Sequence, residues 1–166
     1  MRAALIEGRG LRPPTPLTRI ASPHILILED NPDDEALALR ALRDNDQAAS
    51  AVVARDGVEA LDLLRNVAAR TPDLILVDLK MPRMTGFEFL RAVRADPGFR
   101  HLPLVVFTSS DEARDIERAY EAGATAYVQK PLTFEDFARA IRAVVQFWLE
   151  INQAPRKPPE RLQRLL

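Results

Sequence analysis

Five polar side chains of this sequence share one feature, because each follows a short apolar run within two positions. They are Glu29, Asp30, Asp78, Thr108 and Lys130. Clustered carboxylates repel one another, which raises their pKa values unless a cation lies among them. A hard divalent ion such as Mg²⁺ suits a set of carboxylate, carbonyl and water ligands. If the runs are neighbouring strands, these residues predict an acidic metal site.

A carboxylate beside such an ion can act as a nucleophile toward phosphorus and form an aspartyl phosphate. The transfer requires positive charge around the phosphoryl oxygens, which Lys130 and Mg²⁺ would supply. Thr108 would donate a hydrogen bond to one of those oxygens. The segment 79–85 leaves Asp78 on a loop that a partner can reach.

Each of these residues also has a purely structural interpretation when it is taken alone. Asp30 could cap the next helix or turn, Asp78 could end a strand, and the segment 108–110 could begin a helix. The occurrence of all five at the same end of four different runs favours the functional interpretation.

The runs that precede these residues alternate with segments of helical periodicity. The apolar runs are 25–28, 51–54, 74–77, 104–107 and 126–128. Helical spacing of apolar residues follows each run, over 34–45, 58–67, 87–93, 113–120 and 133–151. Five strands alternating with five helices predict an α/β domain with a doubly wound parallel sheet. Ligands of such sheets bind beyond the carboxyl ends of the strands.

Composition limits the classes of protein to which the chain can belong. Its 166 residues fit one domain, which we expect at 24–151 between a disordered N-terminal tail, 1–23, and a C-terminal tail, 152–166. The absence of cysteine excludes disulfides and thiolate metal sites and fits a cytoplasmic location. No apolar stretch is long enough for a membrane span.

Charge is distributed unevenly along the chain. Each tail has four basic residues against one acidic residue, whereas the segment 24–150 has a net charge of −7. An acidic body does not attract phosphate backbones, so we expect no nucleic acid partner and no membrane partner.

The polar residues, in their order and spacing, resemble a response regulator receiver domain of two-component signalling. The resemblance is carried by Glu29-Asp30, by Asp78 in Leu-Val-Asp-Leu-Lys-Met-Pro-Arg-Met-Thr-Gly, by Thr108, and by Tyr127-Val-Gln-Lys130-Pro131. It implies a flavodoxin-like (βα)5 fold with strand order 2-1-3-4-5. Glu29 departs from the commoner aspartate of the family, but a carboxylate remains at this position.

The resemblance implies a role for each matching residue of the site. Asp78 would accept a phosphoryl group from a phosphohistidine of a sensor histidine kinase, so the protein would be a signalling protein and not an enzyme. Asp30 and Asp78 would bind Mg²⁺, with Glu29 assisting and the backbone carbonyl of Lys80 completing the protein ligands.

The same resemblance implies how the signal leaves the site. Thr108 would move toward the phosphoryl group, Lys130 would pair with it, and Tyr127 would rotate as a switch. The peptide bond between Lys130 and Pro131 is expected to be cis, because the trans preference is small before proline.

The end of the chain suggests an output through a protein contact or through onward phosphotransfer. Only about 15 residues follow the last helix, which is too few for an output domain, and no phosphate-binding loop or nucleophile elbow is present. Beside the stripe that faces the sheet, the helix carries a second apolar stripe of Ala140, Ala143, Phe147 and Ile151. The stripe predicts a homodimer through the fourth helix, fifth strand and fifth helix. Alternatively, Phe147 and Ile151 fold under the basic tail.

The segment 146–155, Gln-Phe-Trp-Leu-Glu-Ile-Asn-Gln-Ala-Pro, also resembles the last helix of single-domain response regulators that partner bacterial phytochromes. Two other classes remain open. One is a phosphatase with an aspartyl nucleophile, although such enzymes place an acid where this chain has Lys80. The other is an interaction module that is not phosphorylated.

Overall fold

The structure is a computed structural model that describes residues 23–44, 49–66 and 69–153. Its elements, in chain order, are β1 (His24–Leu28), α1 (Pro32–Arg43), β2 (Ser50–Ala54), α2 (Gly57–Arg65), β3 (Leu74–Val77), α3 (Gly86–Ala95), β4 (Leu104–Thr108), α4 (Ala113–Glu121), β5 (Ala126–Gln129), α5 (Phe134–Gln146) and the π-helix η1 (Phe147–Ile151). The two predicted tails lie almost wholly outside the described residues.

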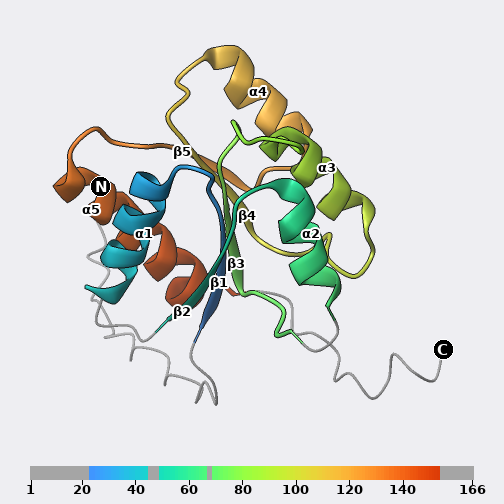
Figure 1. Cartoon of the computed structure of the whole chain (residues 1–166), viewed down its shortest axis with the longest axis horizontal. Coiled ribbons are helices and arrows are strands. Elements are labelled where there is room, and N and C mark those ends of the chain that lie inside the picture. The colour runs from blue at the N-terminus through green and yellow to red at the C-terminus, as the bar shows by residue number, and fades with distance from the viewer. Residues whose placement is uncertain (1–22, 45–48, 67–68, 154–166) are drawn as a thin grey trace, which may run out of the picture.

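The five strands form one parallel sheet in the order β2-β1-β3-β4-β5, which confirms the predicted fold class. Helices α1 and α5 cover one face of the sheet, and α2, α3 and α4 cover the other (Figure 1). Every residue of β3 and β4 is buried, which explains why these strands are continuous apolar runs in the sequence.

Short polar signals fix where the helices begin. Asn31 accepts a hydrogen bond from the N–H of Asp33 at the start of α1, and Thr133 caps α5 in the same way. At the start of α3, Thr85 and Glu88 form a reciprocal capping box. These caps hold the loops at the carboxyl edge of the sheet.

The last helix differs in detail from the prediction, because its regular α-helical part ends at Gln146 and the π-helical turn η1 follows. Val145 and Leu149 are the buried residues of this end, whereas Trp148 is only half-buried. The N–H of Asn152 donates to the carbonyl of Phe147 and closes the wide turn at 2.7 Å.

None of the described helices combines the length and the apolar character that crossing a membrane requires.

Candidate functional site

Glu29, Asp30 and Asp78 meet at the carboxyl edge of the sheet. Each offers a carboxylate oxygen, and these oxygens all lie within 4.8 Å of one another. The pairing of β1 with β3 ends at Leu28 and Val77, so the next residue of each strand emerges at the same edge. Glu29 and Asp78 are buried and Asp30 is exposed, which gives the cluster one side open to solvent. The three carboxylates predicted to converge therefore do so.

Backbone contacts hold two of these carboxylates in place. One oxygen of Glu29 accepts a hydrogen bond from the N–H of Asn31 at 3.1 Å. Asp78 Oδ1 accepts a longer one from the N–H of Lys80 at 3.3 Å. The loop after Asp78 folds back so closely that a Cβ at Gly86 would overlap the Asp78 carbonyl and lie 2.8 Å from Leu79 Cα. Glycine is required here because of this close approach.

Lys130 reaches the same cluster from the end of β5. Its Nζ donates to Glu29 at 2.6 Å, to Asp34 at 2.8 Å and to Asp78 at 2.9 Å. Burial disfavours the ammonium, but the charge of Asp78 and the hydrogen bonds to Asp34 and Glu29 outweigh burial and raise the pKa of Lys130. The lysine is therefore a permanent cation inside the acidic pocket.

The remaining negative charge makes the pocket suitable for a metal ion. One ammonium faces four carboxylates, those of Glu29, Asp30, Asp34 and Asp78. Burial raises the pKa of Glu29, and Lys130 offsets only part of that effect. Oxygen ligands with excess negative charge and an open side fit a hard divalent cation.

Thr108 and Tyr127 lie along the neighbouring strands. Thr108 ends β4 and is fully buried, and its carbonyl accepts a hydrogen bond from the N–H of Lys130 at 2.7 Å. The hydroxyl of Tyr127 donates to the carbonyl of Ser110 at 2.9 Å. Ser110 in turn donates its own hydroxyl to Asp115 at 2.7 Å, and both side chains are buried. The loop after Thr108 is thus fastened to β5 and to α4.

One expectation is wrong. Among the described residues no peptide bond is cis, so the bond between Lys130 and Pro131 is trans. The trans form is intrinsically favoured before proline, and Lys130 Nζ reaches all three carboxylates with it. The metal-binding role of the Lys80 carbonyl stays a prediction.

The sequence did not single out Asp34 or Ser110. Asp34 lies in the first turn of α1, where acidic residues commonly stabilise the helix N-terminus, and this ordinary role conceals its contact with Lys130. Ser110 belongs to a polar run after β4, and only the folded chain shows that both Tyr127 and Asp115 bind it.

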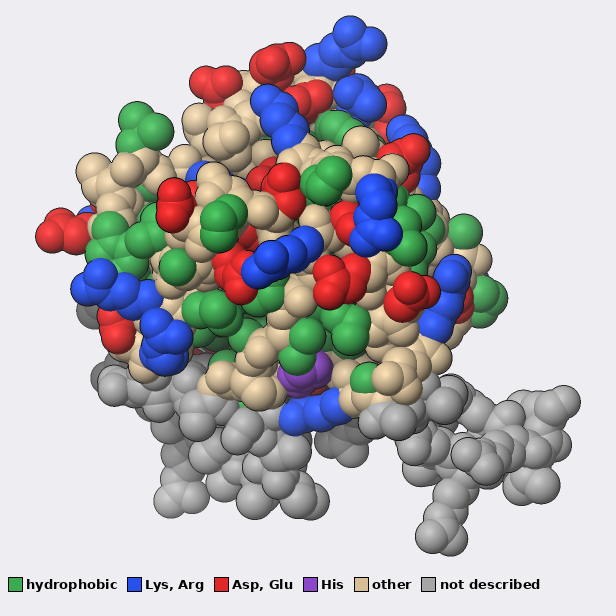
Figure 2. Space-filling view, in the orientation of Figure 1, with side chains coloured by type: hydrophobic (Ala, Val, Ile, Leu, Met, Phe, Trp, Pro, Cys, Tyr) green, Lys and Arg blue, Asp and Glu red, His purple; other side chains and the backbone are tan. Residues whose placement is uncertain are grey.

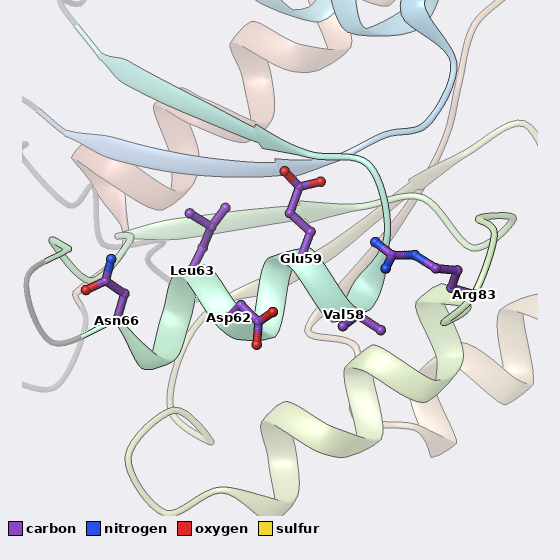
Figure 3. A pocket seen from close by; sticks show the side chains of 6 residues that line it. All are labelled: Val58, Glu59, Asp62, Leu63, Asn66 and Arg83. Carbon is purple, nitrogen blue, oxygen red and sulfur yellow. The ribbon is translucent and has the colours of Figure 1, made fainter.

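A separate groove on the described surface lies elsewhere. It has a volume of about 550 Å³ and runs along α2 next to Arg83. Figure 3 shows the guanidinium of Arg83 extended toward the first turn of α2, where Val58 lies. Arg83 Nε donates to Asp56 at 2.6 Å, and Asp56 also caps α2. None of the clustered carboxylates lines this groove, so we do not assign it to the site.

A cavity of about 10 Å³ lies directly below Glu29 and Asp78, lined mainly by apolar side chains of the sheet, α1 and α5. This volume is about that of a single water position. Glu29 and Asp78 therefore border both the acidic cluster and the apolar core.

Comparison with known proteins agrees with this geometry. Residues 25–142 match the family described as "Response regulator receiver domain". Response regulator Rcp1 of Synechocystis sp. is 29% identical over 135 residues, which is 79% of this chain and 92% of Rcp1. A Mn²⁺-bound structure of response regulator Rcp1 aligns with a TM-score of 0.74 at 28% identity, covering 81% of this chain and 99% of the other.

Two further solved structures are similar over the same region. The phosphorylated cyanobacterial phytochrome response regulator RcpA has a TM-score of 0.77 and 32% identity, covering 82% of this chain and 100% of its own. The bacteriophytochrome response regulator AtBRR has a TM-score of 0.63 and 42% identity, covering 80% of this chain and 99% of its own.

Proposed function

Because this chain belongs to the response regulator receiver domain family, we propose that Asp78 accepts a phosphoryl group from a phosphohistidine of a sensor histidine kinase. The observation that carries the proposal is the position of Asp78, which shares Lys130 with Glu29 and lies in one cluster with Glu29 and Asp30. The protein is then a signalling module of the cytoplasm and not an enzyme that turns over substrate.

The proposed transfer forms one bond and breaks one. A carboxylate oxygen of Asp78 attacks phosphorus, the phosphorus–nitrogen bond breaks, and its electron pair returns to the imidazole of the kinase. Asp30, Asp78, Glu29 and the carbonyl of Lys80 would hold Mg²⁺, which would supply positive charge beside the phosphoryl oxygens. The proposed metal site is supported by the oxygen-rich pocket and by the Mn²⁺-bound relative.

The residues of this chain then stabilise the product. Lys130, already 2.9 Å from Asp78, pairs with the phosphoryl oxygens, and the hydroxyl of Thr108 donates a hydrogen bond to one of them. Movement of Thr108 displaces the Ser110 segment and breaks the hydrogen bond from Tyr127. Tyr127 is released to rotate, and the surface of α4, β5 and α5 changes shape.

We also propose that this surface forms a homodimer. Phe147 and Ile151 are 47% and 60% exposed and lie four residues apart in η1, and contiguous apolar patches of this kind mark interaction surfaces. Ala143 is exposed and Ala140 is half-buried beside them, so the proposed face continues along α5. We expect Phe147→Glu to convert the dimer to a monomer, as measured by light scattering, without slowing phosphorylation of Asp78. A dimer of unchanged mass would contradict the assignment of this face.

The kinase that we propose is a phytochrome. Support comes from the two similar structures described as phytochrome response regulators and from the ending of α5. Transfer of labelled phosphate from an autophosphorylated phytochrome kinase, compared with a kinase of another signal class, tests this pairing. Faster transfer from the unrelated kinase would contradict it.

Neither nucleic acid nor a membrane belongs to the proposed partners. Basic and acidic side chains are interspersed over the face shown in Figure 2, and the segment 24–150 carries a net charge of −7. The described residues on this face offer no continuous basic patch to phosphate backbones.

Incubation with a small phosphodonor and Mg²⁺, followed by intact-mass measurement, tests the proposed function. We expect the wild type to gain one phosphoryl group per chain and Asp78→Asn to gain none, while Asp33→Asn, an exposed acid of α1, behaves as the wild type. Turnover of many phosphate equivalents would indicate a phosphatase instead. No gain in any protein would indicate an interaction module that is not phosphorylated.

A further inference from the structure

Asp34 is the carboxylate of the pocket to which neither the predicted motif nor the proposed reaction assigns a role. It is held by Lys130, whose Nζ donates to Glu29, Asp34 and Asp78 at 2.6, 2.8 and 2.9 Å. An ammonium has three N–H donors, so these three carboxylates occupy all of them. Any new acceptor at Asp78 must compete with Asp34 or Glu29 for Lys130.

Asp34 is more exposed than the other two carboxylates that Lys130 binds. Its side chain is 28% exposed, whereas those of Glu29 and Asp78 are 5% and 10% exposed. Asp34 therefore lies at the mouth of the pocket, between Lys130 and solvent. The cap by Asn31 and the buried face of α1, formed by Ala38, Ala41 and Leu42, hold the helix that carries it.

The charge of Asp34 has opposite consequences for the two ligands of the pocket. The Asp34 and Asp78 oxygens each lie within 3 Å of Lys130 Nζ, so they lie within 6 Å of each other. At this separation, inside a partly buried pocket, a negative charge attracts a divalent cation and repels a phosphoryl group. Asp34 also draws Lys130 toward the mouth of the pocket and keeps one of its donors from the phosphoryl oxygens.

We propose that Asp34 is a positioning residue that acts through Lys130 to raise the affinity of the pocket for a divalent cation and to lower its affinity for a phosphoryl group. This inference rests on the proposed function of Asp78. It makes the phosphorylated state less stable than the family motif alone would make it, because Asp34 adds a second competitor for Lys130 to Glu29, which belongs to the motif.

Two titrations with the full chain test the proposal. The first measures Mg²⁺ binding by calorimetry in the absence of any phosphodonor. The second measures binding of beryllium trifluoride, a non-covalent analogue of the phosphoryl group, at saturating Mg²⁺. Asp34→Asn keeps an oxygen acceptor and removes the charge, whereas Asp34→Glu keeps the charge. Asp33→Asn is the matched control, because Asp33 is the exposed neighbour of Asp34 on the same turn. In the described part of the chain, Lys130 makes its side-chain hydrogen bonds to Glu29, Asp34 and Asp78 and none to Asp33.

We expect Asp34→Asn to bind Mg²⁺ about threefold to tenfold more weakly and beryllium trifluoride more tightly by a similar factor. Asp34→Glu is expected to resemble the wild type, and Asp33→Asn to change each affinity by less than about twofold, since exposed charges are screened.

The opposite signs of the two changes separate a positioning role from a structural one. If Asp34→Asn weakens the binding of both Mg²⁺ and beryllium trifluoride, Asp34 merely supports the fold of the pocket and the proposal is overturned. Unchanged affinities overturn it as well. If the wild type binds Mg²⁺ but no beryllium trifluoride, the proposed function of Asp78 fails and the inference fails with it.

Discussion

Replacement of Lys130 by methionine tests the electrostatic balance of the pocket. The substitution keeps an unbranched side chain but removes the ammonium that lies within 3 Å of Glu29, Asp34 and Asp78. Only 6% of the lysine side chain is exposed, so water cannot replace it easily. Removal of one partner from a buried ion pair typically destabilises a protein by about 3–5 kcal/mol. We expect a value near the lower end, about 3 kcal/mol at pH 8, because Glu29, whose pKa is already raised by burial, can take up a proton.

The loss of folding free energy caused by Lys130→Met is expected to increase as the pH rises. Burial already raises the pKa of Glu29 above the model-compound value of 4.5, so protonated Glu29 is the form that favours folding. The stability that protonated Glu29 contributes is fully present below the pKa of Glu29 in the unfolded chain. It is lost as the pH rises through the pKa of Glu29 in the folded protein. Loss of Lys130 raises the folded pKa of Glu29 further. The destabilisation of Lys130→Met should therefore be small near pH 5 and large at pH 8.

Urea unfolding of the metal-free protein at both pH values measures these free energies. Lys80→Met is the matched control, since Lys80 is exposed and its loss should change the free energy of unfolding by less than about 0.5 kcal/mol. Addition of Mg²⁺ at pH 8 should restore part of the stability of Lys130→Met, because a ligand that binds only the folded state stabilises it. Equal destabilisation at pH 5 and pH 8, or none at pH 8, would refute the reasoning.

Three other substitutions have expected effects on stability, each measurable by urea unfolding. Asp56→Ala removes the cap of α2 and should destabilise by about 1–2 kcal/mol, and no loss would show that the cap is dispensable. Gly86→Ala forces a Cβ against the backbone of Asp78, so it should destabilise by about 1–3 kcal/mol and slow phosphorylation; a neutral effect would contradict the close approach. Arg94→Met removes hydrogen bonds to three carbonyls and to Thr125 and should destabilise by about 2 kcal/mol, whereas a stable variant would mean that water replaces them.

Much of the fold could be predicted because its strands are buried on both faces. A strand such as β4, fully covered by helices, has no polar residue before Thr108 at its end, and its apolar run stands out from the helical periods on either side. The parallel arrangement then brings the ends of β1 and β3 to one edge, which is why Glu29 and Asp78 could be paired before any coordinates were known.

The contacts that depend on tertiary packing could not be predicted in this way. Asp34 has the sequence context of an ordinary first-turn acid, and only the packing of α1 beside α5 brings it within reach of Lys130. Arg83 adopts a backbone φ of 59°, which is uncommon outside glycine, and its ion pair with Asp56 accompanies that conformation. The sequence did not reveal the trans bond before Pro131 either, because the local preference between the two forms is small.

The residue that carries the phosphoryl group can be identified chemically. Borohydride reduces an aspartyl phosphate to homoserine, so reduction of the phosphorylated protein, followed by proteolysis and peptide mass mapping, marks the modified carboxyl. We predict homoserine at position 78 and unchanged aspartate at positions 30 and 34. Homoserine at either of those positions, or at none in a protein that has gained phosphate, would contradict the assignment of Asp78 as the phosphoacceptor.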